Sequence, residues 1–441
     1  MGRKKLLAML LGMTLAAGSL AGCGGGGAKD TPAPAQETKE DEAAVQTKED
    51  EPEQKAAAEK EEITLWHYYT TVNGENFEKM VEAYNNLPEG RVRVTVELIP
   101  RAELLKKYTL GIATGDLPEI AIVDNPDAAS LTAAGMFEEV TELLNGWEGN
   151  SFVSGPLESG QYEGKQYTLP FRSNCLGLFV NEEHLEAAGV EKVPETWDEL
   201  LSACEKLKGM GTSSYPFTMS AVKSEEGVFH FMPFFQSTGA TVNEADSEGG
   251  IKAFEMIARL ASEGYMSNEC INWTQNDVEK QFAAGNASMM INGSWQISNI
   301  LADAPELEYS IAYIPKDKES VSSLGGENIG ITKSAENVEA CWDFVSWMLS
   351  RENNVPFNVA GAAISPRADV TPEEQYPEDE KMRVFVELFE MAKPRGPHPK
   401  WTEISGAYQE GIQAVLVGSK TPEEAAAAVA GKVAEINASV E

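Results

Sequence analysis

Two short groups of aromatic or polar residues each follow directly after an apolar segment of this chain. The first group is Tyr68, Tyr69 and Thr70, and the second is Asp124, Asn125 and Asp127. Aromatic rings pack against apolar faces of a small molecule, whereas carboxylates and amides form hydrogen bonds with its hydroxyl groups. These residue types therefore suit noncovalent binding of a polyhydroxylated ligand. For the second group, ordinary turn formation is an equally good explanation, because Asp, Asn and Pro are common turn residues.

Motifs for catalysis or metal binding are absent from the sequence. The four histidines, His67, His184, His230 and His398, form no HExxH motif, and the chain has no GxSxG, Walker A or GxGxxG segment. The remaining candidates for metal binding are four widely spaced cysteines without a CxxC pair: Cys175, Cys204, Cys270 and Cys341. Such cysteines are more often buried thiols than ligands or disulfide partners. We therefore expect no metal, no cofactor and no enzymatic activity.

An enzyme acting on surface polysaccharides remains the alternative from a different class. Glycoside hydrolysis needs two carboxylates that flank one bond at a defined separation. With 70 acidic residues in the chain, some such pair can always be found, so the presence of carboxylates does not indicate a hydrolase.

The predicted strands and helices that position these two groups of residues alternate along the chain. The hydrophobic pattern predicts strands at 63–68, 92–98 and 119–123, and helices around 77–84 and at 103–114. A β-α-β-α-β order predicts a mainly parallel sheet with helices on both faces, which is the α/β class. Ligands bind at the carboxyl ends of such strands, where Tyr68 and Asp124 lie.

A second region begins near Gln166. We expect an extended segment at 167–181, interrupted around 170–174, and a helix that opens at Thr196 with Glu199 completing a capping box. Further predicted strands lie at 287–292, 309–314 and 329–332, and further predicted helices at 247–263, 295–301, 337–350, 379–391, 404–417 and 422–440.

The N-terminus has the features of an exported protein. A basic start is followed by a short apolar segment, Leu6–Leu20, and then by Leu20-Ala21-Gly22-Cys23, which resembles the bacterial lipobox. The apolar segment is too short to span a bilayer comfortably. We expect residues 1–22 to be a signal peptide and Cys23 to carry lipid. A plain signal peptide with an incidental Cys23 is the alternative.

Residues 23–62 are predicted to be a disordered acidic tether. They are rich in Glu, Lys, Ala, Pro and Gln and cannot bury enough apolar surface to order themselves. A partly helical spacer at 54–62 is the alternative. About 380 residues follow, enough for two ordinary domains. The net charge of −35 argues against nucleic acid and anionic lipid surfaces as partners.

Four sequence motifs, and the order of the predicted elements, resemble those of the extracellular solute-binding proteins of ABC importers, in the family of maltose-binding protein. They are Ile63-Thr64-Leu65-Trp66, the segment Leu110–Ile120, the segment Pro170–Asn181 and the most specific one, Phe282–Trp295. Glu119, Arg172 and Val180 depart from the residues usual in the family.

The resemblance implies a two-lobed fold of the type II periplasmic binding proteins, each lobe a mainly parallel sheet flanked by helices. It implies an N-terminal lobe at 63–172 and 326–370 and a C-terminal lobe at 173–325 and 371–441. We expect hinge crossings near 172–175, 325–328 and 367–372.

The implied function is capture of a carbohydrate, an oligosaccharide by preference, and its delivery to the permease subunits of an ABC importer. The protein would act as a monomer, held by lipid on the extracellular face of the cell membrane. A glycerol-phosphate-like anion or a polyamine is the alternative ligand.

The resemblance also adds candidate ligand contacts. Trp295 would stack on a sugar ring, in preference to a role in the core. Arg172 would lie at the first crossing, paired with a nearby carboxylate in preference to binding an anionic sugar. The other candidates from the crossings and from unassigned aromatic positions are Asn174, Phe229, His230, Trp273, Gly326, Glu327 and Trp401. His67 and Trp66 are expected to be structural.

Overall fold

The computed structural model describes residues 60–440. The predicted signal peptide, Cys23 and nearly all of the predicted tether lie outside these residues. Within 60–440, none of the helices has the length and apolar character needed to cross a membrane.

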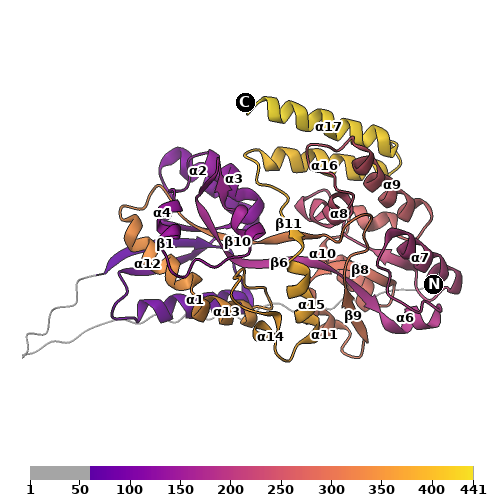
Figure 1. Cartoon of the computed structure of the whole chain (residues 1–441), viewed down its shortest axis with the longest axis horizontal. Helices are drawn as coiled ribbons and strands as arrows, with labels where there is room; N and C mark the ends of the chain where they lie inside the picture. The colour runs from indigo at the N-terminus through magenta and orange to yellow at the C-terminus, as the bar shows by residue number, and fades with distance from the viewer. Residues whose placement is uncertain (1–59, 441) are drawn as a thin grey trace, which may run out of the picture. The chain divides into compact units, whose positions relative to one another are not determined.

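The strands follow the chain in an order that alternates with helices (Figure 1). They are β1 (Glu61–His67), β2 (Val92–Leu98), β3 (Ile120–Asp124), β4 (Gln161–Tyr162), β5 (Lys165–Gln166), β6 (Thr168–Asn181), β7 (Tyr215–Thr218), β8 (Ala287–Gly293), β9 (Tyr309–Ala312), β10 (Ser322–Ile331) and β11 (Ala392–Lys393).

Helices cover both faces of the strands. They are α1 (Thr71–Asn85), α2 (Arg101–Thr114), α3 (Asn125–Ala133), α4 (Thr141–Asn145), α5 (Ser154–Glu158), α6 (Glu182–Ala187), α7 (Trp197–Met210), α8 (Glu225–Ser237), α9 (Glu248–Ser262), the 3₁₀ helix η1 (Asn268–Ile271), α10 (Gln275–Ala283), α11 (Gln296–Asp303), α12 (Val338–Leu349), α13 (Arg351–Ala360), α14 (Pro372–Gln375), α15 (Glu380–Phe389), α16 (Trp401–Leu416) and α17 (Pro422–Ala438).

Two long strands, β6 and β10, join two groups of elements. In Figure 1 they run from the group that contains β1, α1 and α12 into the group that contains β8, α8 and α10. The main strand order is β2-β1-β3-β10-β6-β8-β7. β6 pairs with β10 along its first half and with β8 and β9 along its second half. The chain therefore has two lobes, which share these two crossing strands, and the predicted α/β two-lobed fold is confirmed.

The direction of the strands differs between the lobes. β1 is parallel to β2 and to β3, as the alternating pattern predicted. In the second lobe β7 is parallel to β8 and β10 is parallel to β11, whereas β6 is antiparallel to β8, β9 and β10. The prediction of a mainly parallel sheet is therefore wrong for the second lobe, because a strand shared by both lobes enters that sheet opposite to β8.

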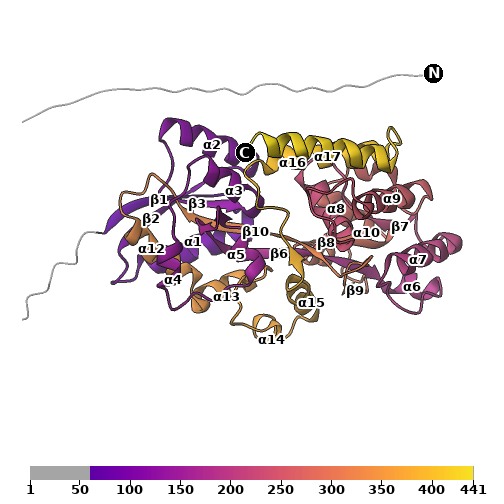
Figure 2. The ribbon, with the colours of Figure 1, turned by 45° about the horizontal axis from the view of Figure 1, so that its top comes forward.

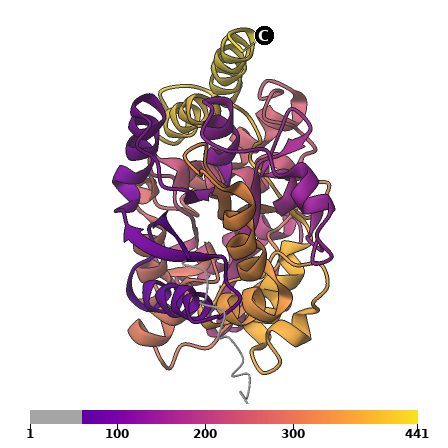
Figure 3. The same ribbon diagram turned by 90° about the vertical axis from the view of Figure 1, so that its left-hand side faces the viewer.

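Each lobe has its own hydrophobic core on both faces of its strands. In the first lobe, Leu65 and Phe77 belong to one cluster, and Trp66 and Tyr108 belong to another on the opposite face. Helices of the first lobe, drawn in indigo and purple, lie on both sides of its strands in Figure 3. In the second lobe the larger cluster joins α7, α8 and α9 to α16 and α17, which lie together in Figure 2.

The local predictions succeeded where the residue pattern was long. The capping box of Thr196 and Glu199 opens α7 as expected. The loop predicted after β3 is wrong, because Pro126 in the first turn allows helix α3 to begin at Asn125. The interruption predicted around 170–174 is present as a β-bulge, because the register between β6 and β10 shifts between the pairs Arg172–Glu327 and Pro170–Asn328, although β6 itself is continuous. Pro170 is tolerated in a continuous β6 because only β10 pairs with the strand at that point.

Candidate functional site

The carboxyl ends of the parallel strands place the candidate residues between the lobes. In the first lobe, β1 ends before Tyr68, β2 is followed by Arg101 at the start of α2, and β3 ends at Asp124. In the second lobe, β8 ends before Ser294 and Trp295. Parallel α/β sheets bind ligands at this edge.

A cavity of about 350 Å³ lies between the two lobes. Its lining comes from the residue after β1 and from α2, β3 and α3 of the first lobe, and from α8 and α16 of the second: Tyr68, Arg101, Leu104, Leu105, Tyr108, Val123, Asp124, Pro126, Asp127, Leu131, Glu225, Trp401, Thr402, Ser405 and Gln409. The structure thus brings together four residues predicted from sequence, namely Tyr68, Asp124, Asp127 and Trp401.

An arginine forms an ion pair and an aromatic contact on the first-lobe wall. Arg101 Nη2 lies 2.6 Å from Asp124 Oδ2, and its guanidinium lies 5.0 Å from the centre of the Tyr68 ring. Burial, and after it the Glu327 carboxylate, raises the pKa of Tyr68 well above its ordinary value. Tyr68 is therefore a neutral hydroxyl and a flat ring at the edge of the cavity.

The second-lobe wall repeats this arrangement with different residues. Arg395 forms an ion pair with Glu225, the first residue of α8, and its guanidinium lies 4.5 Å from the centre of the Phe229 ring. Glu225 also accepts hydrogen bonds from Ser405 and, over 3.1 Å, from Trp401 Nε1. Phe229 is stacked on Trp295, with the ring centres 6.4 Å apart and the planes 24° from parallel. Arg395 thus links the cavity to the predicted aromatic residues Phe229 and Trp295.

Asp127 lies between the two walls and has a different environment. No side chain or backbone group in residues 60–440 donates a hydrogen bond to its carboxyl group. Burial, followed by the carboxylates of Asp124 and Glu225, raises its pKa to about 7, against the opposing effect of Arg395 and Arg101. Around the cavity, two arginines are therefore each paired with a carboxylate, and one further carboxyl group gains a proton near neutral pH.

A more deeply buried group of residues adjoins this cavity. Tyr68 Oη donates to Glu327 Oε1 over 3.1 Å. Glu327 Oε2 and Tyr69 Oη are both buried and have no hydrogen-bond partner among the residues that the structure describes. Burial raises the pKa of Glu327, and Arg172 opposes the shift. Buried polar atoms without partners are uncommon in proteins, so these two atoms are suited to receive a ligand.

Arg172 occupies the predicted crossing, but its partner differs from the expected one. Its Nη2 donates to the Gly361 carbonyl over 2.7 Å, and its guanidinium lies 5.8 Å from the centre of the Tyr69 ring. No carboxylate in 60–440 lies within ion-pair distance of it, so the predicted internal ion pair is wrong. Arg172 acts on Glu327 only through its charge.

The second crossing depends on glycine. Gly326 has a φ of +128°, and a Cβ there would lie 2.2 Å from the Arg172 carbonyl oxygen. At Gly325 a Cβ would lie 2.2 Å from Asn174 Oδ1 and 2.9 Å from the Phe229 ring. Asn174 and Phe229 therefore approach β10 directly, where the two strands pass between the lobes.

Other predicted site residues point elsewhere. His230 is fully buried in α8, its Nδ1 accepts from the Ser220 amide, and burial lowers its pKa to about 3. The ring of Trp273 meets Tyr215, at the end of β7 remote from the lobe crossing. Asn125 is buried within α3, and Thr70 is exposed before α1. These four residues do not line the cavity.

Sequence reasoning missed several lining residues, among them Arg101, Glu225, Ser405 and Gln409, as well as Arg395 behind them. Arg101 could have been found, because it follows the carboxyl end of β2 closely. Glu225 and Ser405 lie on helices whose placement depends on packing in the second lobe, so their positions in sequence gave no signal.

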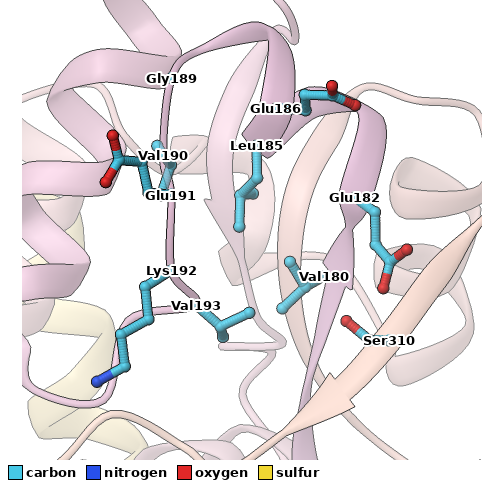
Figure 4. A pocket seen from close by; sticks show the side chains of 10 residues that line it. All are labelled: Val180, Glu182, Leu185, Glu186, Gly189, Val190, Glu191, Lys192, Val193 and Ser310. Carbon is cyan, nitrogen blue, oxygen red and sulfur yellow. The ribbon is translucent and has the colours of Figure 1, made fainter.

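A second cavity, of about 410 Å³, lies at the far end of the second lobe (Figure 4). It is formed by the end of β6, α6, the segment after α6 and β9, with Val180, Leu185 and Val193 among its apolar residues. None of the predicted site residues lines it. The chemistry of the first cavity, with its aromatic and hydrogen-bonding groups, makes that cavity the candidate site.

Comparison with known proteins gives matches over most of the chain. Residues 79–384 match the family model of bacterial extracellular solute-binding proteins. The maltotriose-binding protein of Pyrococcus abyssi is 23% identical and covers 81% of this chain and 78% of its own length. The multiple sugar-binding protein of Streptococcus mutans is 24% identical and covers 62% of this chain and 68% of its own length.

Solved structures agree with the two-lobed architecture. A solute-binding protein of an ABC transporter from Thermotoga lettingae, bound to α-D-tagatose, is 26% identical with a TM-score of 0.73, covering 85% of this chain and 99% of its own. The cyclic α-maltosyl-1,6-maltose-binding protein of Arthrobacter globiformis is 22% identical with a TM-score of 0.74, covering 85% and 98%. The fold is therefore that of the type II periplasmic binding proteins, and the chain belongs to the family of bacterial extracellular solute-binding proteins.

Proposed function

We propose that this protein captures a neutral carbohydrate, an oligosaccharide by preference, between its two lobes and delivers it to the permease of an ABC importer. The observation that carries the proposal is the cavity between the lobes, where aromatic rings and hydrogen-bonding groups converge. Relatives whose names specify maltotriose or cyclic maltosyl-maltose, and the structure bound to tagatose, support the ligand class.

The charges around the cavity support a neutral ligand over the two charged alternatives. Arg101 and Arg395 are each already paired with a carboxylate, so neither is a free cation for a glycerol-phosphate-like anion. Asp127 is the remaining carboxyl group, and burial with the neighbouring carboxylates raises its pKa to about 7, so near neutral pH it offers a polyamine only a partial negative charge. Hydroxyl groups can bind to both the donors and the acceptors of such a site.

The groups available suit binding rather than catalysis, and the family supports the same reading. Tyr68 and Trp295 would provide ring surfaces, with Phe229 packed behind Trp295, and Arg101, Asp124 and Gln409 would bind hydroxyl groups. We propose that the ligand-binding lobes comprise 63–172 with 326–370 and 173–325 with 371–441, and that they move about the shared strands β6 and β10. Cys23 would carry the lipid that keeps this monomer at the extracellular face of the cell membrane.

A thermal-shift screen across neutral oligosaccharides, with glycerol 3-phosphate and spermidine as charged comparisons, tests the ligand class. A ligand that binds only the folded state raises the melting temperature, and calorimetry then gives its affinity. We expect a shift with at least one neutral oligosaccharide. A shift only with the phosphate or the polyamine would overturn the proposed ligand class, and release of new reducing ends from an oligosaccharide would overturn the binding function.

A further inference from the structure

The candidate cavity is lined by carboxyl groups from both lobes. Asp127 is in the first turn of α3, in the first lobe, and Glu225 is the first residue of α8, in the second lobe. Both line the same cavity. Separation of the lobes would move α3 away from α8, so the surroundings of Asp127 depend on whether the lobes are together.

The side chain of Glu225 is held in place by groups of the second lobe. Its carboxylate is held by the Arg395 guanidinium, by Trp401 Nε1 and by Ser405 Oγ, and Gln409 in turn donates to Ser405 over 3.0 Å. The Arg395 side chain is itself only 4% exposed. Asp127 therefore shares the cavity with a carboxylate that is held in place on the opposite lobe.

The two nearby arginine side chains do not neutralise all of the carboxyl groups around the cavity. Arg101, from α2, lies 2.6 Å from Asp124, and Arg395 is engaged by Glu225. Three carboxyl groups, on β3, α3 and α8, thus share two guanidinium groups. Among the other titratable groups of this region, Tyr68 and Glu327 are joined by their own hydrogen bond, and Tyr108 donates to backbone carbonyl groups. One proton on Asp127 would balance the charges and provide a donor for a neighbouring oxygen.

Resting on the function proposed above, we propose that Asp127 and Glu225 form a proton-linked pair across the cavity between the lobes, so that closing the cleft takes up a proton at Asp127 and is favoured at acidic pH. Asp127 thereby regulates ligand capture at the same site.

The direction of the pH effect follows from proton linkage. In an open cleft Asp127 would be hydrated and would have its ordinary pKa of 3.8, whereas in the structure burial and the neighbouring carboxylates raise it to about 7. Between these two values the closed state binds more protons, so its equilibrium constant falls as pH rises, by at most about tenfold per pH unit. Above the higher value both states are ionised and the effect levels off.

Small-angle X-ray scattering of the ligand-free protein at about pH 5 and about pH 8 tests this without any assumption about the ligand. We expect a smaller radius of gyration at the acidic pH in the wild-type protein, and a pH-independent one in Asp127→Asn. Asp116→Asn, at an exposed position beyond α2, is the matched control and should follow the wild type. A wild-type radius that does not change with pH, or an Asp127→Asn variant that keeps the wild-type change, would overturn the proposal.

Calorimetry with maltotriose as the probe gives a second measurement at about pH 6, in two buffers that differ in ionisation enthalpy. Binding by the wild-type protein should take up close to one proton, and binding by Asp127→Asn close to none. Uptake of no proton by the wild type would contradict the proposal. If neither maltotriose nor any other oligosaccharide binds at either pH, the proposed function fails, while the scattering experiment still decides whether Asp127 controls closure.

Discussion

The hydroxyl group of Tyr68 donates a hydrogen bond of 3.1 Å to Glu327 Oε1, although the two residues are 259 positions apart in the chain. This bond joins the end of β1 to the crossing strand β10. It uses one oxygen of the carboxylate and leaves Oε2 buried without a partner among residues 60–440. The contact therefore fixes the side chain of Glu327 and leaves its second oxygen for a ligand.

Replacing Glu327 with Gln should stabilise the ligand-free protein at about pH 8, on the order of 1 kcal/mol, the scale of one uncompensated buried polar group. Burial raises the pKa of Glu327, so the wild-type protein loses stability as pH rises above the ordinary value of 4.5, where the unfolded chain ionises first. Gln retains an acceptor for Tyr68 and does not ionise. Urea denaturation at about pH 4.5 and about pH 8 measures the difference, which should shrink at the lower pH. Glu352→Gln, at an exposed position of α13, is the control; an equal gain there would count against the explanation.

Trp295→Ala should weaken oligosaccharide binding by about 1 kcal/mol or more, the scale of a well-used aromatic contact. Its ring is stacked on Phe229 and only partly buried, so its outer face is available to a ligand. Isothermal titration with the oligosaccharide found by the thermal-shift screen measures the loss. Tyr313→Ala removes an exposed ring from the second lobe outside the cavity and should leave the affinity unchanged. Unchanged affinity in Trp295→Ala would show that this ring is structural.

Gly326→Ala should destabilise the protein by several kcal/mol. Alanine is strained at a φ of +128°, and its Cβ would lie 2.2 Å from a backbone oxygen, which cannot move without disturbing β6. Gly431→Ala is the matched control, because Gly431 lies in α17 with no atom near the position of a Cβ, and the change there should stabilise by about 0.5–1 kcal/mol. Thermal or urea denaturation compares the two. Similar effects at both glycines would refute this account of the crossing.

His230→Gln should make the protein less sensitive to acid. Burial lowers the pKa of His230 from 6.5 to about 3, so between these values the unfolded state binds more protons and stability is lost as pH falls. The loss amounts to at most about 1.4 kcal/mol per pH unit for one such group. Gln can still accept the hydrogen bond from the Ser220 amide. Urea denaturation at about pH 4.5 and about pH 7 should show a smaller decrease in the variant. His67, whose pKa is lowered to about 4, contributes a similar decrease to both proteins.

Local patterns predicted individual elements well because the signals lie within a few residues. β2 was predicted with its observed bounds, and the capping box placed the start of α7. The four cysteines of the described region are buried and free, as the lack of any paired spacing indicated. Burial raises the pKa of Cys175 to about 12, so this thiol is not a nucleophile at neutral pH.

Local signals were a poorer guide at other positions. Pro126 allows the turn residues after β3 to form the first turn of α3, and the pairing of β6 with β10 keeps Pro170 within a strand that has a β-bulge next to it. Aromatic character was also a poor guide by itself. Trp401 lines the cavity and Trp273 does not, although both were assigned from sequence on the same grounds.

The sequence by itself determined the alternation of helices and strands, the resemblance to solute-binding proteins and the position of Tyr68, Asp124 and Asp127 at the carboxyl ends of strands. Periodicity, capping and turn chemistry act within short stretches of chain, so they can be read from neighbouring residues. Only the tertiary structure decided that Glu225 and Arg395 complete the second wall, and that Glu327 meets Tyr68 across 259 positions. Those contacts depend on how β6 and β10 cross between the lobes and on how the helices pack, which no local pattern specifies.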